Sequence, residues 1–197
     1  MPEIAFIMGK SASGKDKIYK NLVSDKELGL KTITLYTTRP KRVGEEEGVE
    51  YHFVDDLQAD QIKEDGKLIE MRCYETVYGI WRYFTVDDGQ VDLSNKSRYL
   101  VIGTLEAYEQ FCAYFGKKHI LPIYIEVDDG IRLQRALDRE KKQEKPRYDE
   151  MCRRFLADSH DFSEDNIKRL GITKRYYNNE VLEDCITEVK NEILKQM

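Results

Sequence analysis

The sequence has few cysteines, and none are spaced as metal ligands. Its four cysteines lie far apart along 197 residues, with no Cys-x-x-Cys pair: Cys73, Cys112, Cys152 and Cys185. This scatter argues against a structural zinc site and predicts reduced thiols in a cytoplasmic protein.

Long hydrophobic runs are also absent. The most apolar stretch, HILPIYIEV at 119–127, has the length of a strand, whereas a membrane-spanning helix needs about 20 apolar residues. A charged loop follows the first short apolar run, which is not a secretory pattern. We therefore expect no membrane partner.

Positive charge is not in excess either. The 32 Lys and Arg residues are outnumbered by 37 Asp and Glu residues, giving a net charge of −5. This balance argues against general nucleic-acid binding, and an anionic substrate would need locally concentrated arginines and lysines. The length fits one globular domain.

Short apolar segments alternate with amphipathic ones along the chain. The expected buried strands are 3–8, 30–38, 98–103 and 119–127, and the expected helices are 14–24, 104–116, 130–160 and 178–197. The first helix should turn Ile18, Leu22 and Val23 inward. The last should bury Val181, Leu182, Ile186, Val189 and Ile193. This order predicts an α/β fold, a parallel sheet with helices on both faces.

The stretch 35–96 is richer in strands and reads as an insertion into that sheet. Its expected elements are strands at 50–54, 67–75 and 77–86 and a helix at 56–66.

The segment from Gly9 to Lys15, GKSASGK, has the spacing G-x-x-x-x-G-K after a buried strand and before a helix. Backbone N–H groups of such a loop curl around phosphate oxygens, and its lysine reaches the outer phosphates. We therefore predict an ATP-binding loop. Its residues are Gly9, Lys10, Ser11, Ala12, Ser13, Gly14, Lys15 and the following Asp16.

A second group of residues lies in TTRPKRVGEEEGVEYHFV. Arg39 and Arg42, three residues apart on a loop, could fork onto one phosphate, and the hydroxyls of Tyr51 and Tyr78 could add neutral donors. The alternative is that both arginines are solvated charges beside the acidic run 45–47.

Together the two segments closely resemble the guanylate kinase family, whose phosphate loop is followed by a TTR-x-x-R-x-G-E…Y-x-F segment. The matching residues are Thr37, Thr38, Arg39, Arg42, Gly44, Glu45, Tyr51 and Phe53. The resemblance implies one domain of the P-loop NTPase type. Its core would be about 1–34, 97–129 and 161–197, its monophosphate-binding insertion about 35–96 and its lid about 130–160.

The resemblance also implies an activity, ATP-dependent phosphorylation of GMP or dGMP with Mg²⁺, by a monomer or homodimer. Arg39, Arg42, Glu45, Tyr51 and Tyr78 would bind the acceptor, and Glu70 would accept from a guanine edge. Lys15, Arg42, Arg139 and Arg154 would be catalytic, with Arg135, Arg147 and Arg153 as further lid candidates. Asn178 and Asn179 match the donor-base region.

The chain departs from the family pattern at three base-contacting positions, where it has Leu35, Ile80 and Gly103. Each lost buried hydrogen bond would weaken base selection by about 1–3 kcal/mol. This leaves open a kinase for another nucleotide or a phosphorylated sugar. A third hypothesis is a non-catalytic interaction module. The retained Lys15 argues against it.

Asp16 occupies a position where such loops usually carry Ser or Thr. The family strand that ends in acidic residues reads Leu100-Val101-Ile102-Gly103 here, without a carboxylate. One hypothesis is that the Mg²⁺ contact has moved to Asp16. The other is that the aspartate is simply favoured at a helix start by the helix dipole.

Overall fold

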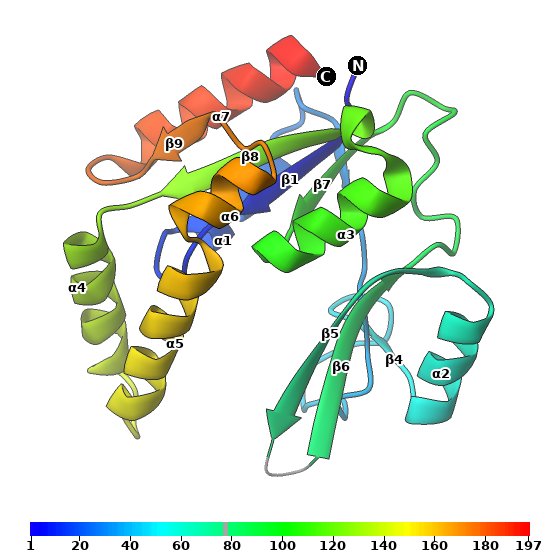
Figure 1. Cartoon of the computed structure of the whole chain (residues 1–197), viewed down its shortest axis with the longest axis horizontal. Helices are drawn as coiled ribbons and strands as arrows, with labels where there is room; N and C mark the ends of the chain where they lie inside the picture. The colour runs from blue at the N-terminus through cyan, green and yellow to red at the C-terminus, as the bar shows by residue number, and fades with distance from the viewer. Residues whose placement is uncertain (77–78) are drawn as a thin grey trace.

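Two β-sheets organise the chain, which the computed structural model describes at residues 1–76 and 79–197 (Figure 1). The first sheet has β1 (Ile4–Met8) at its centre, between β7 (Arg98–Ile102) and β8 (Ile120–Glu126). Its outer strands are β2 (Leu30–Thr32) and β9 (Arg175–Tyr177). All paired strands of this sheet run parallel, so the predicted α/β core is confirmed.

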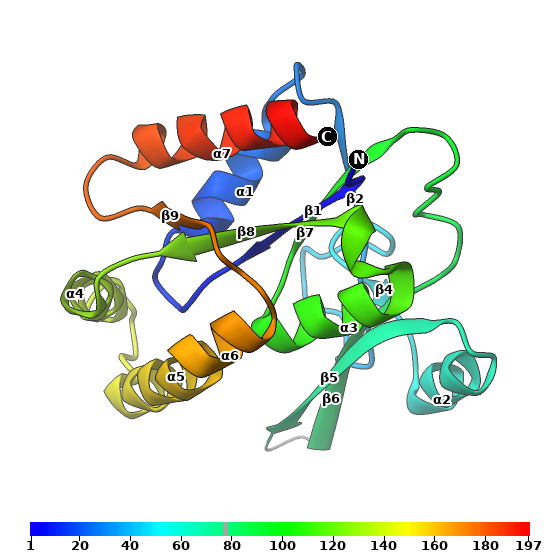
Figure 2. The same ribbon diagram turned by 45° about the horizontal axis from the view of Figure 1, so that its top comes forward.

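The alternation of β1 explains why helices cover both faces. Ile4, Phe6 and Met8 pack on the side of α3 (Leu105–Phe115). Ala5 and Ile7 pack on the side of α1 (Lys15–Ser24) and α7 (Leu182–Gln196), because successive strand side chains point to opposite faces. Figure 2 shows α1 and α7 side by side on one face and α3 on the other.

The second sheet has the order β4 (His52–Phe53), β3 (Tyr36–Thr37), β6 (Gly79–Val86), β5 (Leu68–Thr76). One of its faces packs on α2 (Asp56–Glu64) through Phe84 and Val86. Strand alternation therefore turns Arg72, Tyr74 and Tyr83 to the opposite face.

Two helices after β8, α4 (Asp129–Glu140) and α5 (Tyr148–Asp161), pack against each other at the edge of the molecule (Figure 1). A 3₁₀ turn (Lys117–His119) precedes β8, and α6 (Glu164–Arg169) follows α5. Within the described ranges no helix has the length and apolar content that would let it cross a membrane.

The structure corrects four expectations about these elements. The helix expected at 130–160 is two helices, α4 and α5, because residues 141–147, which include Pro146, form turns and irregular backbone between them. The strand expected at 30–38 is two strands, β2 in the first sheet and β3 in the second, because the chain leaves one sheet for the other between them. Val23 is 36% exposed, since its position on α1 lies 100° around from Leu22. Val181 is 50% exposed because it precedes α7 as its N-cap.

Candidate active site

The loop between β1 and α1 requires both of its glycines. A Cβ on Gly9 would lie 2.6 Å from the carbonyl oxygen of Ile125. Gly14 has φ of +86°, and a Cβ there would lie 2.5 Å from Nδ2 of Asn178. The tight turn predicted from the sequence is thus enforced by the backbone of β8 and by Asn178.

Lys15 and Asp16 open α1 and line a cavity of about 450 Å³, together with Gly9 and Ser11. The pKa of Lys15 is lowered, mainly because the ammonium is buried. The nearby carboxylates of Asp16 and Asp158 raise this pKa and so offset part of the effect. Arg154 and Arg139 also lower this pKa, so lid arginines are close enough to act on the same ammonium. Asp16 is exposed at this cavity.

Sequence reasoning missed Asp158, which lies on α5 and binds the loop. Its Oδ2 accepts from the backbone N–H of Ser11 at 2.7 Å and from Nη1 of Arg132 at 3.4 Å. An anionic oxygen therefore lies on a loop N–H of the kind that binds phosphate.

Arg132 was missed as well, although it lies on the same face of α4 as Ala136 and Arg139, at helical spacing. Its buried guanidinium donates to the carbonyl of Ser11 at 3.1 Å and to Asp129 at 2.8 and 3.0 Å. Burial alone would raise the pKa of Asp129, but Arg132 and Lys10 hold it below its ordinary value. Arg132 thus ties α4 to the phosphate loop.

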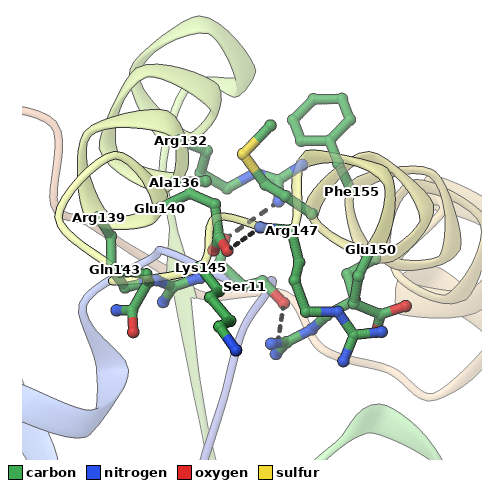
Figure 3. Close-up of a pocket in the computed structure, with 12 residues that line it drawn as sticks. Ser11, Arg132, Ala136, Arg139, Glu140, Gln143, Lys145, Arg147, Glu150 and Phe155 are labelled. Atoms are coloured by element: carbon green, nitrogen blue, oxygen red, sulfur yellow. Dashed lines mark hydrogen bonds between the residues drawn. The ribbon is translucent and has the colours of Figure 1, made fainter.

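A second cavity, of about 270 Å³, lies between α4 and α5 and is lined by several cations (Figure 3). Arg139, Lys145 and Arg147 border it together with Glu140, whose carboxylate accepts from the backbone N–H of Arg147 at 2.6 Å. Nη2 of Arg154 reaches the Ser11 hydroxyl at 3.2 Å. The structure thus brings Arg139 and Arg154 to the loop, and Arg147 with them.

Two other predicted lid arginines have different partners. Arg135 donates to the carbonyl of Asn179 at 3.3 Å, away from the lining of this cavity. Arg153 is paired with Glu150 at 2.7 Å through both Nε and Nη2 and lines the Lys15 cavity.

The predicted acceptor arginines differ in exposure. Arg39 is 3% exposed and donates to Glu45 at 2.8 and 3.1 Å, with its guanidinium 5.5 Å from the ring centre of Tyr51. The Arg42 side chain is exposed, and its backbone N–H donates to Glu45 at 2.8 Å. Glu45 therefore organises the loop between them. Tyr78 lies outside the described residues.

A third cavity, of about 440 Å³, lies beside the second sheet. Its lining is mostly aromatic and apolar: Leu35, Tyr51, Arg72, Tyr74, Trp81, Tyr83 and Ile102. Arg72, Tyr74 and Ile102 also line the Lys15 cavity, so the two cavities are adjacent. Glu70 does not border this pocket, because it is 1% exposed and its carboxylate is bonded to Arg72 and Thr85.

The departures at the end of β7 have a packing cause. A Cβ on Gly103 would lie 2.7 Å from Cζ of Phe6, and Val101 belongs to the core on the α3 side. An aspartate at 103 would collide with Phe6.

Among the described residues, no group of three His, Cys, Asp or Glu side chains could hold a metal ion.

Asn178 packs against the loop between β1 and α1. It is buried, and its Nδ2 donates to the carbonyl of Ser13 at 2.8 Å. Asn178 therefore supports the phosphate loop from beneath.

Comparison with known proteins agrees with this geometry. A family model described as guanylate kinase matches residues 2–164. A guanylate kinase of Mycoplasma mobile is 28% identical over 207 residues, covering 98% of this chain and 92% of that protein. A guanylate kinase of Coxiella burnetii is 37% identical over 75 residues, covering 37% of this chain and 35% of that protein.

Among solved structures, the guanylate kinase of Anaplasma phagocytophilum superposes with a TM-score of 0.66 at 17% identity. The superposition covers 100% of this chain and 87% of that one, and it supports the same fold. With the family match extending over most of its length, the chain belongs to the guanylate kinase family.

Proposed function

We propose that the protein transfers the terminal phosphoryl group of ATP to a nucleoside monophosphate, GMP or dGMP, giving the diphosphate. The observation that carries this proposal is that two cavities lie side by side and share Arg72, Tyr74 and Ile102 in their linings. One contains Lys15 beside the phosphate loop, and the other is lined by aromatic side chains that suit a planar base.

The ATP phosphates would lie on the loop N–H groups, with Lys15 at the outer phosphates. The exposed carboxylate of Asp16, at the start of α1, would hold Mg²⁺, which takes phosphate and water oxygens and few protein ligands. The metal would neutralise charge on the transferring group. This function for Asp16 is part of the proposal.

Residues 130–160 would act as the lid. Arg139 and Arg154 would neutralise charge on the moving phosphoryl group, and Arg147 would assist them from the same cavity. Closure of these helices would exclude water and so suppress ATP hydrolysis.

Residues 35–96 would bind the acceptor, with its phosphate near Tyr51 and the loop of Arg39 and Arg42. The acceptor oxygen is already anionic, so no general base is needed. Exposed Arg42 is free to turn toward the phosphate, whereas buried Arg39 would act while bonded to Glu45.

A coupled assay of ADP release across AMP, GMP, dGMP, CMP and UMP tests the proposal. We expect GMP and dGMP to give the highest kcat/KM. Turnover of a different acceptor with none of GMP would assign a second function, a kinase for another base. Leu35 favours that second function, because it lines the pocket with an apolar group where a hydroxyl would bond a base. No turnover and no ATP binding by calorimetry would leave an interaction module.

A further inference from the structure

Arg72 lies in β5 at the junction of the Lys15 cavity and the aromatic pocket. It is paired in register with Tyr83 of β6 and shares its face of the sheet with Tyr74. Among the described residues that line the aromatic pocket, Arg72 alone is charged. A ligand in this pocket would therefore meet a guanidinium and not a carboxylate.

Glu70 fixes the position of that guanidinium. Its Oε2 accepts from Nε of Arg72 at 3.0 Å and its Oε1 from Nη2 at 3.3 Å, while Thr85 donates to Oε1 at 2.9 Å. Burial lowers the pKa of Arg72, but Glu70 and Tyr74 outweigh it, and the net shift is upward. The guanidinium thus stays charged and oriented, at 14% exposure of its side chain.

The buried partner decides what Arg72 can recognise. Because Glu70 neutralises it, the guanidinium offers directional N–H donors with little net charge. Such donors suit the acceptor atoms of a neutral base edge better than a dianionic phosphate, for which Lys15 and the lid arginines are better placed.

We propose that Arg72 is the base-selecting residue of the acceptor pocket, that Glu70 is its positioning residue, and that the acceptors are 6-oxopurine monophosphates. This inference rests on the proposed function and names its substrate class. An arginine donates well to O6 and N7 of guanine, whereas adenine presents its N6 amino group, a donor, in place of O6. Hypoxanthine keeps both O6 and N7, so IMP should be accepted together with GMP.

The first experiment measures kcat/KM of the purified full chain for GMP, IMP, AMP and 7-deaza-GMP at saturating ATP. We expect IMP within about threefold of GMP and AMP at least about 100-fold lower. 7-Deaza-GMP, which lacks N7, should lose about tenfold. Strong discrimination against IMP would show that the 2-amino group is read, which is the pattern of a carboxylate reader, and would overturn the assignment to Arg72.

The second experiment compares Arg72→Met, Arg72→Lys and Glu70→Gln with a matched control, Arg82→Met. Arg82 lies on the opposite, α2-facing side of the same hairpin, where it pairs with Asp60. Arg72→Met should lower kcat/KM for GMP and IMP by about 10- to 100-fold through the KM of the acceptor, leaving AMP and the KM of ATP unchanged. Arg72→Lys should recover part of this loss.

Glu70→Gln keeps an oxygen that accepts from Arg72, so the preference for GMP over AMP should remain within about threefold. The control variant should match the wild type. An equal loss for every monophosphate in Arg72→Met would show that Arg72 binds phosphate and would overturn base selection. Base selection by Arg72 would also be overturned if Glu70→Gln lost the preference for GMP over AMP while Arg72→Met kept it.

Equilibrium binding separates this inference from the proposed function. Calorimetry with GMP, IMP and AMP needs no turnover. Suppose that the wild type binds GMP and IMP without transferring a phosphoryl group, and that Arg72→Met binds both more weakly. This result would support the present inference and refute the kinase activity. If the wild type phosphorylates GMP and Arg72→Met keeps the same selectivity among monophosphates, the kinase activity would be supported and the present inference refuted.

Discussion

The carboxylate of Asp158 accepts a hydrogen bond from the backbone N–H of Ser11 at 2.7 Å, which joins α5 to the phosphate loop. The contact spans 147 residues of sequence. A negative oxygen on a loop N–H takes a place that a phosphate oxygen would otherwise use. Under the proposed function, nucleotide binding at the loop would therefore compete with this side chain.

We expect Asp158→Ala to bind ATP about three- to tenfold more tightly than the wild type, since it frees a donor and removes a like charge. Asp158→Asn removes the charge and keeps an accepting oxygen, so it separates the two effects. Calorimetry with ATP and Mg²⁺ gives both dissociation constants. Weaker binding by both variants would mean that the carboxylate assists closure of the lid.

Lys15→Met should lower kcat by at least about 100-fold, because the ammonium stabilises charge on the transferring phosphoryl group. Lys17→Met, an exposed lysine on the same helix, is the matched control and should retain activity. Steady-state kinetics measures the change, and circular dichroism checks that both variants are folded. A loss confined to the KM of ATP would reduce Lys15 to a binding residue.

Asp16→Asn tests the two hypotheses for this carboxylate. If Asp16 holds Mg²⁺, the concentration of Mg²⁺ for half-maximal activity should rise about tenfold. If it serves the helix dipole, the variant should lose about 0.3–1 kcal/mol of stability with its Mg²⁺ requirement unchanged. Mg²⁺ titrations at fixed ATP and urea unfolding, carried out on the same preparation, distinguish the outcomes.

Gly103→Ala should destabilise the fold by about 1–3 kcal/mol, because its Cβ would overlap the Phe6 ring. Phe6→Leu opens space there, so the double variant should lose less than the sum of the two single changes. Urea unfolding of the four proteins completes the cycle. Strict additivity would show that Phe6 does not exclude a side chain at 103.

Stability should fall with rising pH between about 9 and 11 because of Cys185. Burial raises the pKa of this thiol from 9.0 to about 11, and the unfolded thiol ionises at the lower value. Over this window the unfolded state binds fewer protons, so the free energy of unfolding decreases by up to about 1.4 kcal/mol per pH unit.

Cys185→Ala should show a shallower decline over the same window, whatever its stability at neutral pH. Cys152→Ala, at an exposed thiol, is the control and should follow the wild type. Chemical unfolding at pH 8, 9, 10 and 11 measures the three slopes. Equal slopes in all three proteins would exclude the thiol as the cause.

The local pattern of the sequence determined the parallel core and the phosphate loop. IAFIM is apolar throughout and is followed by GKSASGK. The apolar run and the glycine spacing each involve residues close together in the sequence, so the strand and the loop could be predicted from it. The short β9 and α6 escaped prediction, because three to six residues carry no periodic signal.

Only the tertiary structure decided the surroundings of the site. Three of its features could not be predicted from the spacing of residues in the sequence. They are the hydrogen bond between Asp158 and Ser11, the hydrogen bonds between Glu70 and Arg72, and the close approach of Phe6 to Gly103. Strand and helix positions follow from short-range periodicity. The partner of a charged side chain depends instead on how the sheets and helices pack, and that packing buries Glu70 and pairs it with Arg72.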